Sequence, residues 1–175
     1  MARIAHIGPP APPMSAQEPF WQPLGRIVFA YGYLETQIDW CISTLLDTDS
    51  TQGEPSVASQ IRNICSRVAL VEALFRQLTA GEQQRTQLHG LVKELRALLK
   101  FRNSVLHGSW GAYLEDRHTW QKPRTDPFDL RAGSFEVSVE AIDEHIERAA
   151  AIGNALVELI RSVAGERRAQ AVHAP

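Results

Sequence analysis

The sequence predicts an all-α fold, an antiparallel four-helix bundle with an irregular or small β-hairpin excursion between the third and fourth long helices. Four long segments place apolar residues at spacings of three and four, which is the period of an amphipathic helix. The turn at 78–81 is short enough to make its two helices antiparallel neighbours. Residues 109–138 show no helical period, and their alternating pieces WGAYLE and SFEVSV are typical of extended chain.

The length of 175 residues corresponds to one domain with a sizeable core. We expect this single helical domain to span residues 21–164. Residues 1–20 are rich in proline and lack periodicity, so they predict a flexible N-terminal arm. Residues 165–175 form a polar segment, which predicts a flexible C-terminal tail.

The first two helices are predicted from their apolar stripes. The first runs from about Leu24 to Leu46, and its stripe contains Ile27, Tyr31, Leu34, Ile38, Cys41 and Leu45. The second begins after Ser56, a residue type that caps helix N-termini, and runs to Leu78. Its stripe contains Val57, Ile61, Ile64, Val68, Val71, Phe75 and Leu78, and Cys65 beside it is interpreted as a core residue.

The third helix carries the feature around which the rest of the chain is interpreted. Thr79 and Glu82 form a capping-box signature at its start, and Gly108 marks its end. Its stripe consists of Leu88, Leu91, Leu95, Leu98, Arg102 and Val105. Arg102 is anomalous there, because an unpaired charge on a buried face is costly. It therefore needs a carboxylate, a partner chain or an anionic ligand.

The fourth helix is predicted to begin after Ser138, which is a suitable N-cap, and to end near Gly165. The excursion before it is about thirty residues long, and loops of that length usually have a function or are disordered. It begins directly after the polar end of the third helix, so we expect it to lie beside that end.

Three polar residues gather at the end of the third helix. Asn103 and His107 are four residues apart and share a helix face, and Arg102 is adjacent and long enough to converge with them. An imidazole titrates near neutral pH and can act as general acid or base. A guanidinium matches phosphate oxygens and stabilises charge that develops on them. This combination is suited to cleaving RNA, which carries its own nucleophile in the 2′-OH.

The run Arg102 to His107 reads R-N-x-x-x-H, and it resembles the motif of the HEPN superfamily, many of whose members are metal-independent ribonucleases. A three-residue pattern of this kind arises by chance roughly once per hundred chains of this length. The resemblance implies a helical bundle and an endoribonuclease that cleaves RNA through 2′-OH attack. Its catalytic residues would be Arg102, Asn103 and His107, and it would need neither a cofactor nor a metal.

The same resemblance implies partners for this chain. RNA would be the substrate, and a homodimer with facing motif helices would form a composite active site. A bacterial toxin or an antiphage-defence effector would be the biological setting, with an antitoxin or regulatory partner.

Two acidic residues of the first helix are expected to support the site. The segment LETQIDWCISTLL resembles the first helix of several HEPN-like families, which carry an acid in this part of the bundle. We therefore expect Glu35 to pair with Arg102, with Asp39 as the second candidate. The alternative, that both are ordinary solvent-facing charges, stays open.

Two interpretations of the motif other than catalysis remain open. The chain is alternatively a non-catalytic HEPN-like module that binds a nucleotide, RNA or a protein partner. It is also consistent with a helical dimerisation domain, in which Arg102 joins two helices through Glu35 and His107 caps a free carbonyl.

Composition excludes several classes of protein. The net charge of −2 argues against binding nucleic acid through bulk electrostatics. No apolar run is long enough for a membrane span, and no apolar leader is present, so a cytoplasmic protein without membrane contact is expected. The two cysteines, Cys41 and Cys65, lie in helical patterns rather than at disulfide or metal spacings. Asp47 and Asp49 lack further ligands, so no metal site is predicted.

Overall fold

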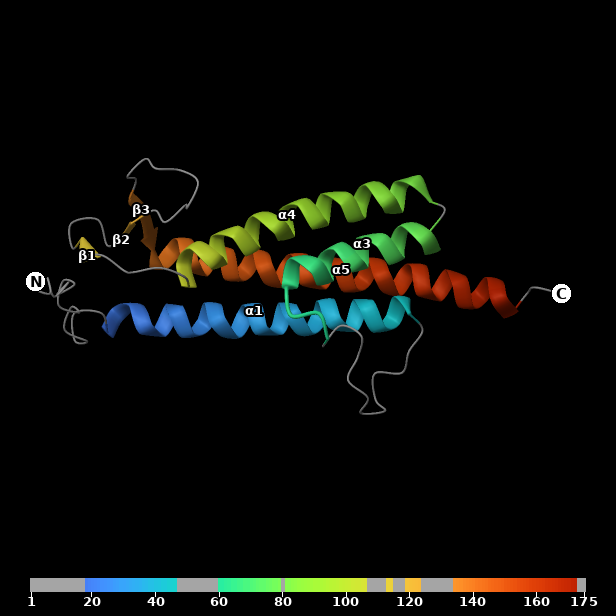
Figure 1. Ribbon diagram of the computed structural model, residues 1–175, viewed down its shortest axis with the longest axis horizontal. Coiled ribbons are helices and arrows are strands. Elements are labelled where there is room, and N and C mark those ends of the chain that lie inside the picture. Colours follow the sequence, from blue (N-terminus) through green and yellow to red (C-terminus); the bar gives the residue numbers. More distant parts are fainter. Residues whose placement is uncertain are drawn as a thin grey trace, which may run out of the picture.

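The protein is described from a computed structural model, which is a helical bundle with a small sheet at one end (Figure 1). The structure describes residues 18–46, 60–79, 81–106, 113–114, 119–123 and 134–172. Its helices in these ranges are α1 (Glu18–Leu45), α3 (Ile64–Leu78), α4 (Glu82–Leu106) and α5 (Val139–Val172). Its strands are β1 (Tyr113–Leu114), β2 (Thr119–Pro123) and β3 (Ser134–Ser138).

The core lies between the four helices, and the sequence stripes predict its members well. All six stripe residues of α1, from Ile27 to Leu45, are at most 4% exposed. The core of the other helices consists of Val68, Val71, Phe75, Leu88, Val92, Leu95, Leu98, Leu99, Val105, Ile142, Ala149, Ile152, Leu156, Leu159, Ile160 and Val163. Burial of these apolar surfaces is the main force that holds the helices together. The prediction that Cys65 is a core residue is wrong, because its side chain is exposed.

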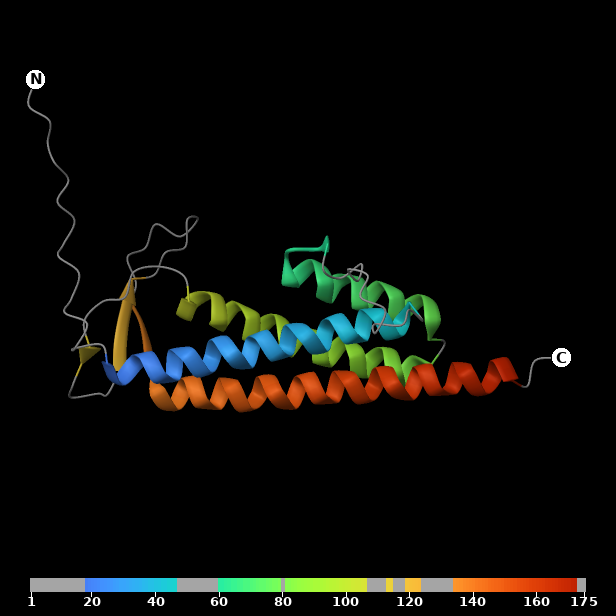
Figure 2. The same cartoon turned by 90° about the horizontal axis from the view of Figure 1, so that it is seen from below.

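The helix directions differ from the predicted antiparallel bundle. Residues 26, 37 and 40 of α1 contact residues 143, 154 and 161 of α5, so these two helices run in the same direction (Figure 2). Residues 85 and 96 of α4 contact residues 76 and 72 of α3, and residues 94 and 101 of α4 contact residues 148 and 145 of α5. Residue numbers thus rise along α4 while they fall along its neighbours, so α4 is antiparallel to the other three helices. The up-and-down pattern fails because α3 begins beside the middle of α1, where Arg67 contacts Asp39, and runs in the same direction as α1. Bundles with long crossover connections contain parallel neighbours of this kind.

The second predicted helix begins later than its stripe suggests. Residues 61–63 are not helical, and Ser56, the expected N-cap, lies outside the described residues. Asn63 has an extended backbone with φ of −89° and ψ of 119°, and its side chain accepts a hydrogen bond from the amide of Cys65 at 2.8 Å. Asparagine is among the preferred N-cap residues, so this bond defines the start of α3.

The helices at the two ends of the described chain are longer than predicted. α1 begins at Glu18, within the range assigned to the N-terminal arm. α5 begins where expected, because the Ser138 hydroxyl accepts from the Ala141 amide at 3.1 Å, but it continues past Gly165 to Val172. Glycine costs a helix only about 1 kcal/mol. Glu166 accepts hydrogen bonds from Gln84 of α4 and from Ser162, and these contacts support the helix on either side of Gly165.

A three-stranded antiparallel sheet of order β1-β2-β3 precedes α5. β2 pairs with β3 along its whole length, from Thr119 opposite Ser138 to Pro123 opposite Ser134. The sheet lies at the end of the bundle where α4 finishes and where α1 and α5 begin (Figures 1 and 2). The polar end of α4 therefore lies at the same end of the bundle as the sheet.

The contact between α1 and α5 at Gly153 yields a stability prediction. A Cβ atom at Gly153 would collide with the amide oxygen of Gln37, which is buried, and would come within 3.0 Å of Leu34. Gln37 cannot move freely, because its Nε2 donates to Asn154 Oδ1 at 2.9 Å. We expect Gly153→Ala to lower the free energy of unfolding by about 1–2 kcal/mol, as overpacking outweighs the gain in helix propensity. Urea titration would measure this loss.

A double-mutant cycle isolates the collision as the cause. Gln37→Ala removes the obstructing atom, so Gly153→Ala in that background should stabilise the protein rather than destabilise it. Equal losses in both backgrounds would show that Gly153 matters for another reason.

Candidate functional site

The end of α4 brings Arg102 and Asn103 together. Arg102 Nη1 donates a hydrogen bond to Asn103 Oδ1 at 3.1 Å. Arg102 is half-buried, and its stripe neighbours Leu98 and Val105 are at most 2% exposed. The amide oxygen thus holds one nitrogen of the guanidinium, while both side chains keep further N–H groups that can donate. His107 lies just outside the described residues, which end at Leu106 in this helix.

Tyr31 of α1 supports the turn of α4 that carries Arg102. Its hydroxyl is buried and donates to the carbonyl oxygen of Leu98 at 2.9 Å, four residues before Arg102. Burial raises the pKa of Tyr31 to about 12, and the charges of Arg102 and Arg148 oppose that rise. The phenol therefore stays neutral at physiological pH and keeps its role as a donor. The sequence marks Tyr31 only as a core residue, because a helical stripe does not reveal where a hydroxyl points.

His145 of α5 also lies beside this end of α4. It is half-buried, and its ring stacks on Phe101 with a centroid separation of 3.5 Å and an interplanar angle of 16°. Its Nδ1 lies 2.7 Å from the carbonyl oxygen of Ala141. In the neutral tautomer that donates this bond, Nε2 is an acceptor. Nothing in the spacing of α5 indicates this stacking.

Among the described residues, Arg102 has no carboxylate partner. Two neighbouring arginines do have one: Arg148 lies 3.7 Å from Glu94, and Arg26 lies 2.8 Å from Asp143. Paired cations contribute little free positive charge, whereas a half-buried arginine without such a pair favours an anion. Of these three arginines, Arg102 is therefore the one best placed to bind a phosphate.

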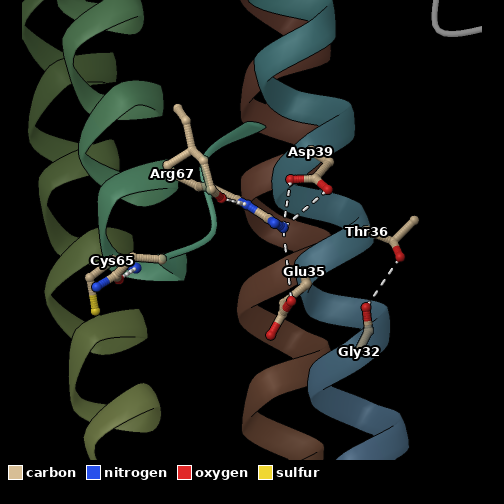
Figure 3. Close-up of polar contacts among 8 residues, drawn as sticks. Gly32, Glu35, Thr36, Asp39, Cys65 and Arg67 are labelled. Atoms are coloured by element: carbon tan, nitrogen blue, oxygen red, sulfur yellow. Dashed lines mark hydrogen bonds and ion pairs between the residues drawn. The ribbon is translucent and has the colours of Figure 1, made fainter. Parts of the chain in front are cut away.

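The prediction that Glu35 or Asp39 pairs with Arg102 is wrong. Both carboxylates face Arg67 of α3 instead of Arg102 (Figure 3). Arg67 Nη1 lies 3.2 Å from both oxygens of Asp39 and 3.8 Å from Glu35 Oε2, and Nε donates to the carbonyl oxygen of Ile61 at 2.6 Å. Tyr31, Glu35 and Asp39 follow one ridge of α1, and only its first member meets α4. Glu35 and Asp39 thus join α1 to α3 and do not belong to the motif.

This ion-pair cluster carries a second stability prediction. The Arg67 side chain is only 13% exposed, so removing it leaves two partly buried carboxylates without their cation. We expect Arg67→Met to lower the free energy of unfolding by about 2 kcal/mol, measured by urea titration. Arg62→Met is the matched control, since Arg62 is exposed, and it should change stability little.

The pH dependence of this effect has a definite sign. Burial raises the pKa of Asp39 above its ordinary value, and Arg67 opposes that rise. Without Arg67 the pKa of Asp39 rises further, so the native state binds more protons than the unfolded state as pH falls towards that pKa. The stability deficit of Arg67→Met should therefore shrink as pH falls from neutrality into the acidic range. A deficit that grows instead would contradict this description of the cluster.

The described residues contain no group of three or more His, Cys, Asp or Glu side chains placed to hold a metal ion. Within the same ranges, no helix has both the length and the apolar composition that crossing a membrane requires. Comparison with known proteins returns no matching family model, no matching curated protein and no matching solved structure. The function is therefore inferred from the chemistry of the α4 end.

Proposed function

We propose that this chain is a metal-independent endoribonuclease of HEPN-like type, which cleaves RNA through attack of a 2′-OH on the adjacent phosphate. The observation that carries the proposal is the half-buried Arg102, which is hydrogen-bonded to Asn103 and lacks a carboxylate partner in the described part of the chain. A guanidinium in this state is prepared for a phosphate group.

Each residue has a distinct role in the proposed reaction. Arg102 donates hydrogen bonds to the non-bridging phosphate oxygens and stabilises their charge in the transition state. Asn103 holds the guanidinium through its amide oxygen. His107 moves protons, either from the attacking 2′-OH or to the departing 5′-oxygen. Tyr31 is a positioning residue, because it fixes the turn of α4 before Arg102.

One arginine and one histidine make a sparse active site, and a second copy of the chain would complete it. The resemblance to the HEPN superfamily implies a homodimer whose motif helices face each other across a composite cleft. The role of a toxin or antiphage effector in the cytoplasm, with an antitoxin or regulatory partner, belongs to the same proposal.

The N–H donors of Arg102 and Asn103 also support a second candidate function, which is binding without cleavage. The Arg102–Asn103 pair presents N–H groups to an anion whether or not a proton is then transferred. The chain would then bind a nucleotide or RNA without cleaving it. Affinity for RNA would fall in Arg102→Ala, and no fragments would form with any variant.

Incubation of the purified protein with labelled tRNA and mRNA in EDTA tests the proposal. We expect cleavage of RNA and no cleavage of single-stranded DNA of the same sequence, which lacks the 2′-OH. Cleavage of both polymers, or of RNA only after a divalent metal is added, would contradict the mechanism. RNA that is bound but left intact would favour the second candidate.

A further inference from the structure

The charges of the chain are distributed unevenly over its helices. α3 and α4 together carry seven Lys or Arg residues and three acidic residues, whereas α1 and α5 together carry five and nine. α3 and α4 lie side by side in the bundle (Figure 1). The net charge of −2 for the whole chain therefore combines a positive pair of helices with a negative pair. A locally positive surface attracts anions even where the net charge of a protein is near zero.

Two arginines share one carboxylate between α3 and α4. Arg76 Nη2 donates a hydrogen bond to Glu72 Oε1 at 2.7 Å, and Arg96 Nη2 donates to Glu72 Oε2 at 3.0 Å. A third arginine lies beside them, since Arg85 donates to the carbonyl oxygens of Thr79 and Arg76 at 2.9 and 3.2 Å. One carboxylate neutralises only one of these three charges, so the cluster has an excess of positive charge.

The arginine pair keeps N–H donors that Glu72 does not use. Among the described residues, the side chains of Arg76 and Arg96 make no hydrogen bond other than the one to Glu72. The Glu72 side chain is only 14% exposed, whereas those of Arg76 and Arg96 are 63% and 49% exposed, so the unused donors are accessible. Guanidinium groups bind phosphate oxygens through such parallel donors. His89 Nδ1 lies 3.9 Å from Glu72 Oε1, too far for a hydrogen bond, so the imidazole is not assigned to this site.

The arginine pair lies on the face of α4 that leads to the motif. Arg96 and Asn103 are both exposed and are seven residues apart, which is about two helical turns, so they share one face. Their separation along the helix axis is about 10 Å. Glu94 does not interrupt this face, because it points towards α5 and lies 3.7 Å from Arg148. A nucleotide of a stacked strand advances about 3.4 Å, so the two positions are about three nucleotides apart.

We propose that Arg76 and Arg96 anchor the RNA backbone by binding a phosphate about three nucleotides away from the one that is cleaved. Glu72 keeps the two guanidiniums together while no RNA is bound, and Arg85 adds positive charge beside them. This inference rests on the proposed function, because the RNA that the anchor holds is the substrate of the motif. The anchor contacts the backbone and not the bases, so it selects RNA by length rather than by sequence.

Fluorescence anisotropy with a labelled 2′-O-methyl RNA of ten nucleotides tests the anchor, because this RNA lacks the nucleophile and stays intact. Arg96→Gln should raise the dissociation constant by about ten-fold and lower the salt dependence of log Kd by about 0.7. Glu72 keeps Arg76 in this variant, so the protein should stay folded, which circular dichroism would verify. Arg161→Gln is the matched control, since it removes an exposed arginine of α5 that pairs with Glu158 at 2.7 Å. An unchanged dissociation constant in Arg96→Gln, or an equal rise in Arg161→Gln, would overturn the proposal.

Glu72→Gln separates an anchor from an ion pair that only joins two helices. The amide keeps an acceptor oxygen but removes the negative charge that competes with phosphate for the guanidiniums. RNA binding should therefore become tighter by about two- to five-fold, because a negative charge beside the phosphate site is lost. If Arg76 and Arg96 only joined α3 to α4, the variant would lose thermal stability without a gain in RNA affinity, and that result would contradict the anchor.

Substrate length distinguishes a failure of the anchor from a failure of the ribonuclease proposal. A dinucleotide has a single phosphodiester and cannot occupy the motif and the anchor together. Arg96→Gln should thus lower kcat/KM by about ten-fold for a ten-nucleotide RNA and by less than about two-fold for a dinucleotide. Equal losses for both substrates would refute the anchor and leave the ribonuclease proposal intact. Binding of the modified RNA that depends on Arg96, without cleavage of any RNA by wild type, would refute only the ribonuclease proposal.

Discussion

Replacing His107 by alanine is expected to lower the rate of RNA cleavage by about 10²- to 10⁴-fold, which is the usual contribution of a general acid or base. The scheme needs a group that titrates near neutral pH, and His107 is the imidazole in the motif beside Arg102. Gel analysis of labelled RNA after incubation with each variant in EDTA would measure the loss.

His89→Ala is the matched control for this variant. His89 lies on the same helix, with a side chain that is 69% exposed, and its Nδ1 lies 3.9 Å from Glu72 Oε1. Its removal should leave cleavage unchanged. A folded His107→Ala protein that cleaves at the wild-type rate would refute the role assigned to His107.

Replacing Arg102 by alanine is expected to lower the cleavage rate by about 10²- to 10³-fold, because a donor to the developing phosphate charge is lost. Arg102→Lys should recover only part of the rate, since an ammonium group cannot bind two phosphate oxygens as a planar guanidinium does. Lys100→Ala, which removes an exposed cation from the same turn, should retain most of the activity.

The stability of Arg102→Ala separates a functional arginine from a structural one. No described carboxylate pairs with Arg102, so its removal leaves no unpaired partner, and the free energy of unfolding should stay equal to that of wild type or rise. If Arg102 instead joined two helices, its removal should lower the free energy of unfolding, as is expected for Arg67→Met. A loss of about 2 kcal/mol in Arg102→Ala with no change in RNA binding would therefore favour the dimerisation-domain interpretation.

The sequence predicts the helices better than their directions. Apolar spacing identifies the buried face of α1 and most of the core of α4, because burial alone determines that pattern. It contains no information on the path between α1 and α3, so the parallel direction of α3 was not predictable. Gly165 likewise does not end α5, since contacts of Glu166 with another helix outweigh a local preference.

The sequence likewise predicts only part of the candidate site. The adjacency of Arg102 and Asn103 follows from helix geometry, and their hydrogen bond agrees with it. The partner of Glu35 and Asp39 was mispredicted, because either Arg67 or Arg102 satisfies the charge and only the packing of α3 on α1 decides between them. The contributions of Tyr31 and His145 depend on which helices meet at the end of α4, and that is a tertiary property.

The ends of the RNA fragments that wild type produces in EDTA test the central claim most directly. Attack by the 2′-OH breaks the bond to the 5′-oxygen, so we predict fragments with 2′,3′-cyclic phosphate and 5′-hydroxyl ends. These ends can be identified by mass spectrometry and by resistance of the 5′ ends to phosphatase and their ready labelling by a kinase. Fragments with 3′-hydroxyl and 5′-phosphate ends would contradict the account, because they require water rather than the 2′-OH as the nucleophile.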